Sequence, residues 1–193
     1  MELKEAVLFA IYERTRMKGR HCTVNNIMKN LEVYKQFKAK GKNDLRNEVI
    51  ATIYQLMDEQ AIESIINDKA KKKEDMVCVC IPEDNVEEVR QEYRANAKAR
   101  YDALTPAAAQ VLQSIYTKHE IMREPYIIRD MTPAKQDIFW QHADQLHDCG
   151  FVGIRDTYNK DGEILNCQNA VISISAKIAC DMSRNAESQQ NRE

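Results

Sequence analysis

The chain has 193 residues, of which 44% are hydrophobic and 30% are charged, and its formal net charge is −2. This length suffices for two small domains, each with a modest core of its own. No apolar run approaches the roughly 20 residues needed to cross a bilayer, so the composition argues against a membrane protein.

The charge is distributed unevenly along the chain. Between Arg14 and Arg46, ten basic residues stand against only Glu32 and Asp44, which gives that segment a charge of +8. From residue 83 to residue 193, 13 basic and 18 acidic residues leave a charge of −5. This asymmetry favours different roles for the two parts of the chain.

Residues 1–83 show the pattern of three helices followed by a β-hairpin. Apolar residues recur at helical spacing from Leu3 to Ile11, Thr23 is a suitable N-cap for a second helix, and Asp44 is expected to cap a third. Two strand-like runs flank a lysine-rich tip, and Pro82 ends their pairing because it has no N–H to donate. This order of elements predicts a winged helix over residues 1–83.

A connecting helix is predicted over residues 84–104, where Val86, Val89 and Tyr93 form a narrow apolar stripe. A second winged helix is then predicted over residues 105–176. Its first helix begins at Thr105-Pro106, a cap followed by proline at the first helical position. A short second helix is expected over residues 125–130.

The third helix of this copy should begin at Thr132-Pro133 and end at Gly150. Its expected core face is Ile138, Phe139, Ala143 and Leu146. Two strands follow, joined by the turn sequence Asn-Lys-Asp-Gly. Residues 177–193 read as a polar tail that is disordered after Ser183. The predicted fold class is therefore α+β and mainly helical, with two winged helices in tandem.

The first copy carries the candidate DNA-binding residues. In a winged helix the third helix usually enters the major groove and the wing contacts the backbone. Arg46 and Asn47 could reach base edges, whereas the acidic C-terminal half of the same helix would be repelled by phosphates. The other cations would position the duplex through its phosphates. The candidates are Arg14, Arg16, Lys18, Arg20, Lys29, Lys35, Lys38, Lys40, Lys42, Arg46, Asn47, Lys69, Lys71, Lys72 and Lys73. The alternative is that these lysine-rich faces are simply solvated.

The second copy has a different character. Its third helix carries Asp137, Asp144 and Asp148 against only Lys135, which argues against contact with phosphates. Trp140 falls outside the apolar stripe of that helix. An exposed tryptophan would be a protein-binding anchor, whereas a shift in the helical phase would bury it.

Catalytic and metal-binding patterns are missing from the sequence. The glycines lack the spacing of a phosphate-binding loop, and no nucleophile or acidic pair has a recognisable catalytic partner. The six cysteines and four histidines lack the spacing of a structural zinc site. Cys78 and Cys80 share one strand face and are expected to fill the core. The sequence thus predicts a protein that is not an enzyme, has no cofactor or metal, and keeps reduced thiols in a prokaryotic cytoplasm or a eukaryotic nucleus.

Five segments of the first copy carry a resemblance to a known family. They are residues 4–13 as the first helix, 23–28 as the entry to the second, 45–57 as the third, 60–65 as its exit and 77–86 (Val-Cys-Val-Cys-Ile-Pro-Glu-Asp-Asn-Val) as the last wing strand. Over these segments the chain resembles the C-terminal winged helix of the archaeal and eukaryotic origin-recognition-complex/Cdc replication initiators. The resemblance implies binding of duplex DNA at replication origins within a larger assembly. Family members carry an ATPase module before this domain, so this chain would be a separated fragment or a stand-alone relative.

We therefore expect a non-enzymatic DNA-binding protein of replication initiation or a related nucleoprotein complex. Its first winged helix would contact duplex DNA, and its second would contact a protein partner or a second protomer. One alternative is a tandem winged-helix adaptor that binds only proteins. Another is a dimeric transcription regulator, which would need a palindromic site. No membrane contact and no small-molecule substrate are evident.

Overall fold

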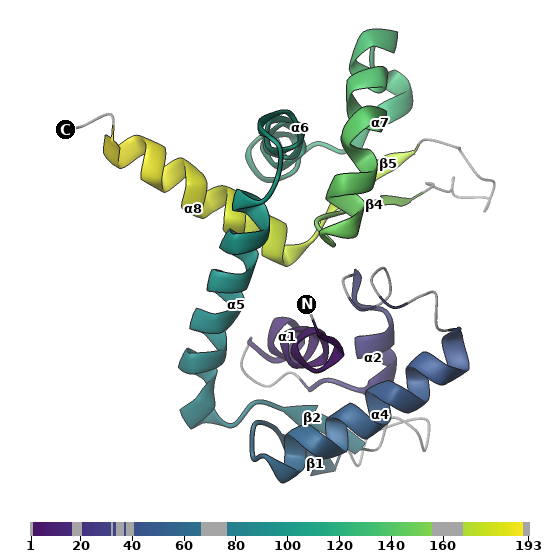
Figure 1. The fold of residues 1–193 in the computed structure, drawn as a ribbon, viewed down its shortest axis with the longest axis vertical. Coiled ribbons are helices and arrows are strands. Elements are labelled where there is room, and N and C mark those ends of the chain that lie inside the picture. Colours follow the sequence, from purple (N-terminus) through teal and green to yellow (C-terminus); the bar gives the residue numbers. More distant parts are fainter. Residues whose placement is uncertain are drawn as a thin grey trace. The chain divides into compact units, whose positions relative to one another are not determined.

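The computed structural model describes residues 2–16, 21–31, 33, 37, 41–66, 77–155 and 168–190. The described part is mainly helical with small antiparallel sheets, so the predicted α+β class is confirmed. The chain divides into two compact units, Met1–Tyr93 and Arg94–Glu193 (Figure 1). None of the helices in the described ranges has the length and apolar character needed to span a bilayer.

In the described part of the first unit, helices α1, α2 and α4 precede a hairpin and α5 follows it, and Leu31, Val33 and Phe37 between α2 and α4 are also helical. The elements are α1 (Leu3–Thr15), α2 (Val24–Met28), α4 (Lys42–Asp58), β1 (Glu63–Ile66), β2 (Val77–Cys80), the 3-10 turn η3 (Glu83–Asn85) and α5 (Val86–Asp102). Strands β1 and β2 pair antiparallel, with Glu63 opposite Cys80. Just before α2, Cys22 forms an antiparallel bridge with Val79 on the other edge of β2, through N–H···O bonds of 3.0 and 2.8 Å.

Two helix starts in this unit have different chemistry. Thr23 caps α2 as predicted, since its hydroxyl accepts from the Asn26 N–H and the Asn26 side chain accepts from the Thr23 N–H. The expected cap Asp44 is wrong, because α4 begins at Lys42 with Gly41 as its N-cap. Gly41 has a φ of 81°, which glycine adopts at little cost. Asp44 instead lies in the first turn, where a carboxylate interacts favourably with the helix dipole.

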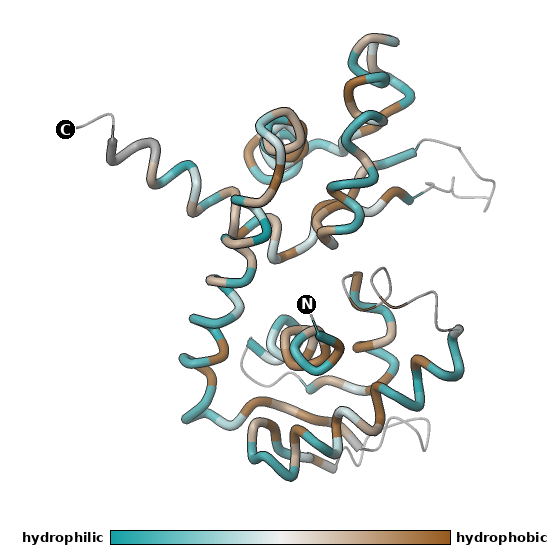
Figure 2. Tube along the Cα trace, viewed as in Figure 1, coloured by the Kyte–Doolittle hydropathy of each residue, from teal (hydrophilic) through white to brown (hydrophobic). Residues whose placement is uncertain are grey.

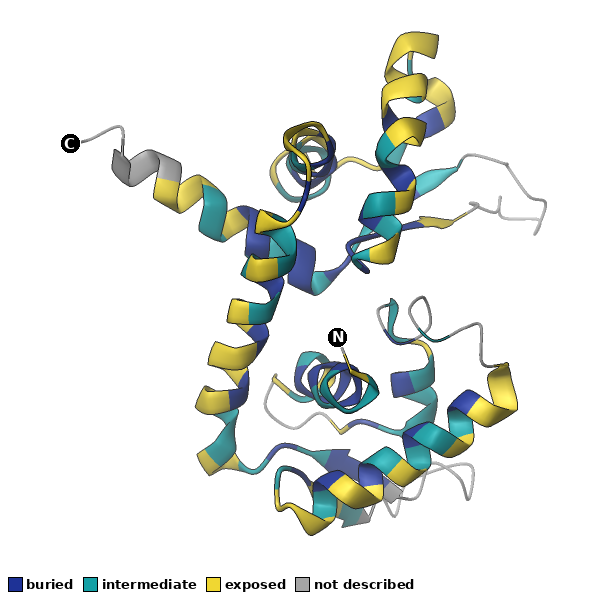
Figure 3. Cartoon of the chain, viewed as in Figure 1, coloured by how far each residue is buried: buried dark blue, intermediate teal, exposed yellow. Residues whose placement is uncertain are grey.

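The core of the first unit is built on α1, which is rich in hydrophobic residues (Figure 2) and is buried over much of its length (Figure 3). Phe9, Ile11 and Tyr12 are at most 5% exposed, and Tyr93 of α5 is fully buried against them. The Tyr93 ring centroid lies 5.1 Å from that of Phe9 and 5.2 Å from that of Tyr12. The first half of the predicted connecting helix is therefore part of this core.

The second unit begins in α5 and continues through α6 (Pro106–Tyr116). The remaining elements are the π-helical turn η4 (Thr117–Ile121), β3 (Tyr126–Ile127), the 3-10 turn η5 (Ile128–Asp130), α7 (Pro133–Asp148), β4 (Val152–Arg155), β5 (Asn169–Ile172) and α8 (Ile174–Gln190). The sheet order is β3-β5-β4, and both pairings are antiparallel. Thr105 caps α6 as predicted, with its hydroxyl accepting from the Ala108 N–H.

The short second helix expected over residues 125–130 is wrong in its first half. Tyr126 and Ile127 are extended and pair with Ala170 and Asn169 of β5. Aromatic and β-branched residues favour such a strand, and only Ile128–Asp130 form a 3-10 turn.

Ile138 is also not a core residue, because it is 50% exposed. The buried face of α7 is Phe139, Ala143 and Leu146, and Ile138 lies beside it.

The predicted polar tail is wrong over residues 177–190, because α8 extends to Gln190. Ala176, Ala179 and Cys180 are fully buried in the core of the second unit. Small side chains let α8 approach α6 closely, and the polar residues on its other face hid this narrow stripe in the sequence. The Tyr116 hydroxyl of α6 donates to Asp181 of α8, and the Arg184 guanidinium lies 5.6 Å from the Tyr116 ring centroid.

The two units repeat the same order of elements in detail. In each, the last strand of the hairpin is central and also pairs with a segment that precedes the second helical element. The first helices share Val-Leu-x-x-Ile-Tyr, at 7–12 and 111–116. The long helices α4 and α7 bury residues at the same distances from their C-terminal ends. Leu56 in α4 corresponds to Leu146 in α7, for example. A final helix then packs on the first helix, α5 in one unit and α8 in the other.

The ends of α4 and α7 give a stability prediction. Gln60 and Gly150 occupy equivalent left-handed positions, with φ of 59° and 70°. In the folded state a residue other than glycine is strained at this position by roughly 1–2 kcal/mol. Glycine removes that strain, but its greater conformational freedom stabilises the unfolded chain by about 0.4–1 kcal/mol. Gln60→Gly should therefore raise the free energy of unfolding by about 0.5–1 kcal/mol in urea denaturation. Gly150→Ala should lower it, and a destabilising Gln60→Gly would contradict the assignment.

The buried thiols give a prediction about alkaline pH. Burial raises the pKa of Cys22 and Cys180 to about 12, from 9.0 for a free thiol. The unfolded chain therefore loses these protons first as the pH rises above 9.0. The stabilisation from both buried thiols should be fully present below that pH and should be lost as the pH rises from 9.0 to about 12. Urea unfolding at increasing pH should show this decline, and Cys22→Ala/Cys180→Ala should flatten it. Constant stability across that range would contradict the burial of both thiols.

Candidate functional site

Four cationic side chains of the first unit stand exposed on the elements expected to meet DNA. Arg14 and Arg16 lie at the end of α1, Lys29 at the end of α2 and Lys42 at the start of α4. Exposed ammonium and guanidinium groups are accessible to phosphate oxygens. The remaining predicted cations lie outside the described residues: Lys18, Arg20, Lys35, Lys38, Lys40, Lys69, Lys71, Lys72 and Lys73.

The two candidate base readers are in different environments. Asn47 is exposed on α4, whereas Arg46 is half-buried and donates through Nη1 to Oδ1 of Asn25 at 2.9 Å. This hydrogen bond joins α4 to α2. Arg46 thus has a structural role, and contact with a base would compete with its bond to Asn25. Asn47 is the freer of the two side chains for base contact.

A carboxylate at the end of α1 is held by α5 and by the residue that follows the cap of α2. Glu13 accepts from the Asn30 amide at 2.8 Å and from the Tyr93 hydroxyl of α5. These two hydrogen bonds fix the position of the Glu13 carboxylate, which is the negative charge nearest in sequence to Arg14 and Arg16. The pair of arginines therefore projects from a fixed helix end rather than from a loose one.

The outward face of α4 is acidic toward its C-terminus, as expected from the sequence. Glu59, which follows the helix, is bound by Lys4 of α1 at 2.5 Å, and the hydrogen bond from Lys4 lowers the pKa of that carboxyl. Asp58 is exposed, and Tyr54 is 64% exposed one turn earlier. Any DNA contact by α4 is therefore expected from its first turns, at Lys42 and Asn47.

In the second unit Trp140 is exposed on α7. Its side chain is 42% accessible, and its ring meets that of Phe139 edge to face with centroids 5.1 Å apart. The sequence left open whether Trp140 is exposed or buried, and the structure shows that it is exposed. Phe139 is 1% exposed, so Trp140 rests on a fixed aromatic support.

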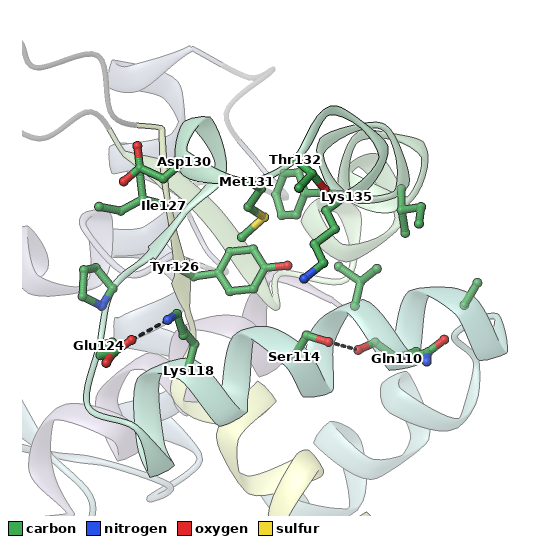
Figure 4. Close-up of a pocket in the computed structure, with 15 residues that line it drawn as sticks. Gln110, Ser114, Lys118, Glu124, Tyr126, Ile127, Asp130, Met131, Thr132 and Lys135 are labelled. Atoms are coloured by element: carbon green, nitrogen blue, oxygen red, sulfur yellow. Dashed lines mark hydrogen bonds and ion pairs between the residues drawn. The ribbon is translucent and has the colours of Figure 1, made fainter.

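A groove of about 820 Å³ lies beside this aromatic pair, between α6 and the start of α7 (Figure 4). Its apolar lining includes Val111 of α6, Tyr126 of β3, Met131, and Ile138 and Phe139 of α7. Tyr126 lies across the middle, with its hydroxyl directed toward the side of Lys135 (Figure 4). Burial raises the pKa of the Tyr126 hydroxyl, which therefore stays protonated at neutral pH.

The groove contains four charged side chains in different situations. Lys118 and Glu124 form an ion pair with each other (Figure 4). The Asp130 carboxylate points away from Tyr126, whereas the Lys135 ammonium extends toward the centre (Figure 4). Lys135 is exposed and forms no ion pair with any residue that the structure describes. Of the two lysines that line the groove, Lys135 is therefore the one whose charge is not paired within it.

Sequence reasoning missed this groove because it placed a helix where β3 lies and Ile138 in the core. The signal available was the apolar Ile138 on an otherwise polar face of α7.

Over the described ranges, no three His, Cys, Asp or Glu side chains are arranged to hold a metal ion. His119 illustrates a structural use of such a residue, since its Nε2 lies 2.6 Å from the carbonyl oxygen of Ala170.

Comparison of the chain with protein-family models, with curated proteins and with solved structures gave no match. The resemblance to replication initiators therefore remains a prediction from the sequence. Function has to be inferred from the arrangement of residues in each unit.

Proposed function

We propose that both units are winged helices and that the protein is a non-enzymatic DNA-binding protein. What supports the fold assignment is the topology shared by the two units. Over the described residues of each, a helix is followed by a short extended segment, at least one short helical element, a long helix and a hairpin whose last strand pairs with that extended segment. This is the order of elements in a winged helix, in which the long helix enters the major groove.

The first unit would bind duplex DNA, and the observation that carries this proposal is its segregated charge. The unit as a whole has 16 basic and 17 acidic residues, yet residues 14–46 alone carry +8. Attraction to DNA would therefore be local, directed at the ends of α1 and α2 and the start of α4. Such contacts position the duplex without reading its sequence. A role in replication rests on the family resemblance alone.

A protein partner is the better candidate for the second unit. Its long helix α7 carries the exposed carboxylates Asp137, Asp144 and Asp148, which would repel phosphates. The same helix exposes Ile138 and Trp140. Exposed apolar side chains of this size are typical of protein-binding surfaces. An adaptor whose two units both bind proteins is the alternative if duplex binding is absent.

The salt dependence of DNA binding tests the first unit. Log affinity for a random duplex should fall linearly with log salt, with a slope of about −0.9 for each phosphate contact. Lys29→Glu/Lys42→Glu should make this slope less negative by about 2 and weaken binding at low salt by at least about tenfold. Fluorescence anisotropy with a labelled duplex measures both quantities.

The matched control is Lys135→Glu/Arg155→Glu, which reverses two exposed charges in the second unit. It should leave the salt slope unchanged, and circular dichroism should show that both variants are folded. No duplex binding at low salt would overturn the proposal. Equal losses in the two double variants would show that net charge, rather than the face of the first unit, governs binding.

A further inference from the structure

We infer that the groove between α6 and α7 docks an amphipathic helical segment of a partner protein, one that carries a carboxylate beside its apolar stripe. The inference rests on the proposed protein-binding role of the second unit and names the site and the chemistry of the partner. It is independent of DNA binding by the first unit, because every groove residue belongs to the second.

The walls of the groove provide the apolar half of the recognition. Val111 of α6 and Phe139 of α7 are nearly buried, so they form a fixed floor, while Ile138 is 50% exposed at the rim. Ile138 gains burial only if something enters the groove. Covering apolar surface releases roughly 25 cal/mol per Å². The side chains that fit such a floor are Leu, Ile, Met or Phe.

The lysine that is not paired within the groove provides the polar half. Lys118 is paired with Glu124, and the Asp130 carboxylate points away from Tyr126, whereas the Lys135 ammonium extends toward the centre of the groove (Figure 4). The Lys135 ammonium and the Tyr126 hydroxyl, which both line the groove, are hydrogen-bond donors. A carboxylate on the bound segment would therefore be matched in charge and in hydrogen bonding, whereas a lysine at that position would be repelled.

The openness of the groove favours a helix over a small molecule. The α6 side is bordered by the exposed residues Ala107, Gln110 and Ser114, one helical turn apart. Sites for small molecules usually bury 70–90% of the ligand, and this one is open along α6. An amphipathic helix inserts apolar side chains at i, i+3, i+4 and i+7 into a groove of this kind and leaves its polar face in water.

A fluorescent reporter is built into the site. Tyr126, Phe139 and Trp140 form a chain of ring contacts, with centroids 6.1 and 5.1 Å apart, that leads from the groove to the surface of α7. Trp140 is the only tryptophan in the chain. Occupation of the groove should therefore change its emission without any added label.

The test uses the full chain and two synthetic helical peptides. Both have leucines at i, i+3, i+4 and i+7; one carries glutamates beside the leucine stripe and the other carries lysines there. We expect the acidic peptide to bind, to shift the Trp140 emission, and to perturb amide NMR signals of α6, β3 and the start of α7. The lysine peptide should bind about five- to tenfold more weakly.

Two pairs of variants connect the binding to the groove. Lys135→Glu should reverse the preference between the peptides, whereas Arg155→Glu, an exposed cation outside the lining, should not. Ile138→Asp should weaken both peptides about tenfold or more. Ile121→Asp, at a side chain 52% exposed and outside the lining, should leave both affinities unchanged.

Each contrary result has a definite meaning. Absence of binding by the acidic peptide, or equal affinity for both peptides, would overturn the inference. So would NMR shifts in the groove caused by raising the protein concentration alone, because they would show a second copy as the occupant. If the duplex still binds with the expected salt slope in these cases, the DNA-binding proposal stands and only the groove assignment fails.

Discussion

Each unit depends on the pairing of its last hairpin strand with a segment from before the second helical element. In the first unit this is a single bridge between Cys22 and Val79, and in the second it is the pairing of β3 with β5. A two-stranded hairpin alone is marginally stable in water. The added edge fixes the strand against the helices and sets where the second helix begins. The position of the long helix, and of every candidate binding residue on it, follows from that anchor.

Much of this arrangement could be predicted from residue patterns, and the failures have identifiable causes. Thr23 and Thr105 marked helix starts correctly because a capping hydroxyl acts locally. The sequence pattern wrongly predicts a helix at Tyr126. Its extended conformation depends on pairing with Ala170, which lies far along the chain and leaves no local signal. The helix α8 was missed because its buried stripe consists of small side chains, which carry little hydrophobic signal. The groove could not be predicted, since it exists only once β3, α6 and α7 are together.

The two units use the same topology with different surfaces. The first presents cations at the ends of its helices, with its acidic α4 face partly neutralised by the ion pair between Lys4 and Glu59. The second presents an aromatic and aliphatic surface on α7 beside an open groove. A shared fold sets where a surface lies, and the side chains set what it binds. Proposed contact with DNA in one unit and with a protein in the other follows from that difference.

The buried cysteines also make the opening of each unit separately observable. Cys22 and Cys78 lie in the core of the first unit and Cys180 in that of the second, all at most 1% exposed. An alkylating reagent reaches such a sulfur only during local unfolding. The rate at which each thiol is labelled therefore reports the opening frequency of its own unit. One chain thus contains native probes for comparing the dynamics of two copies of a fold.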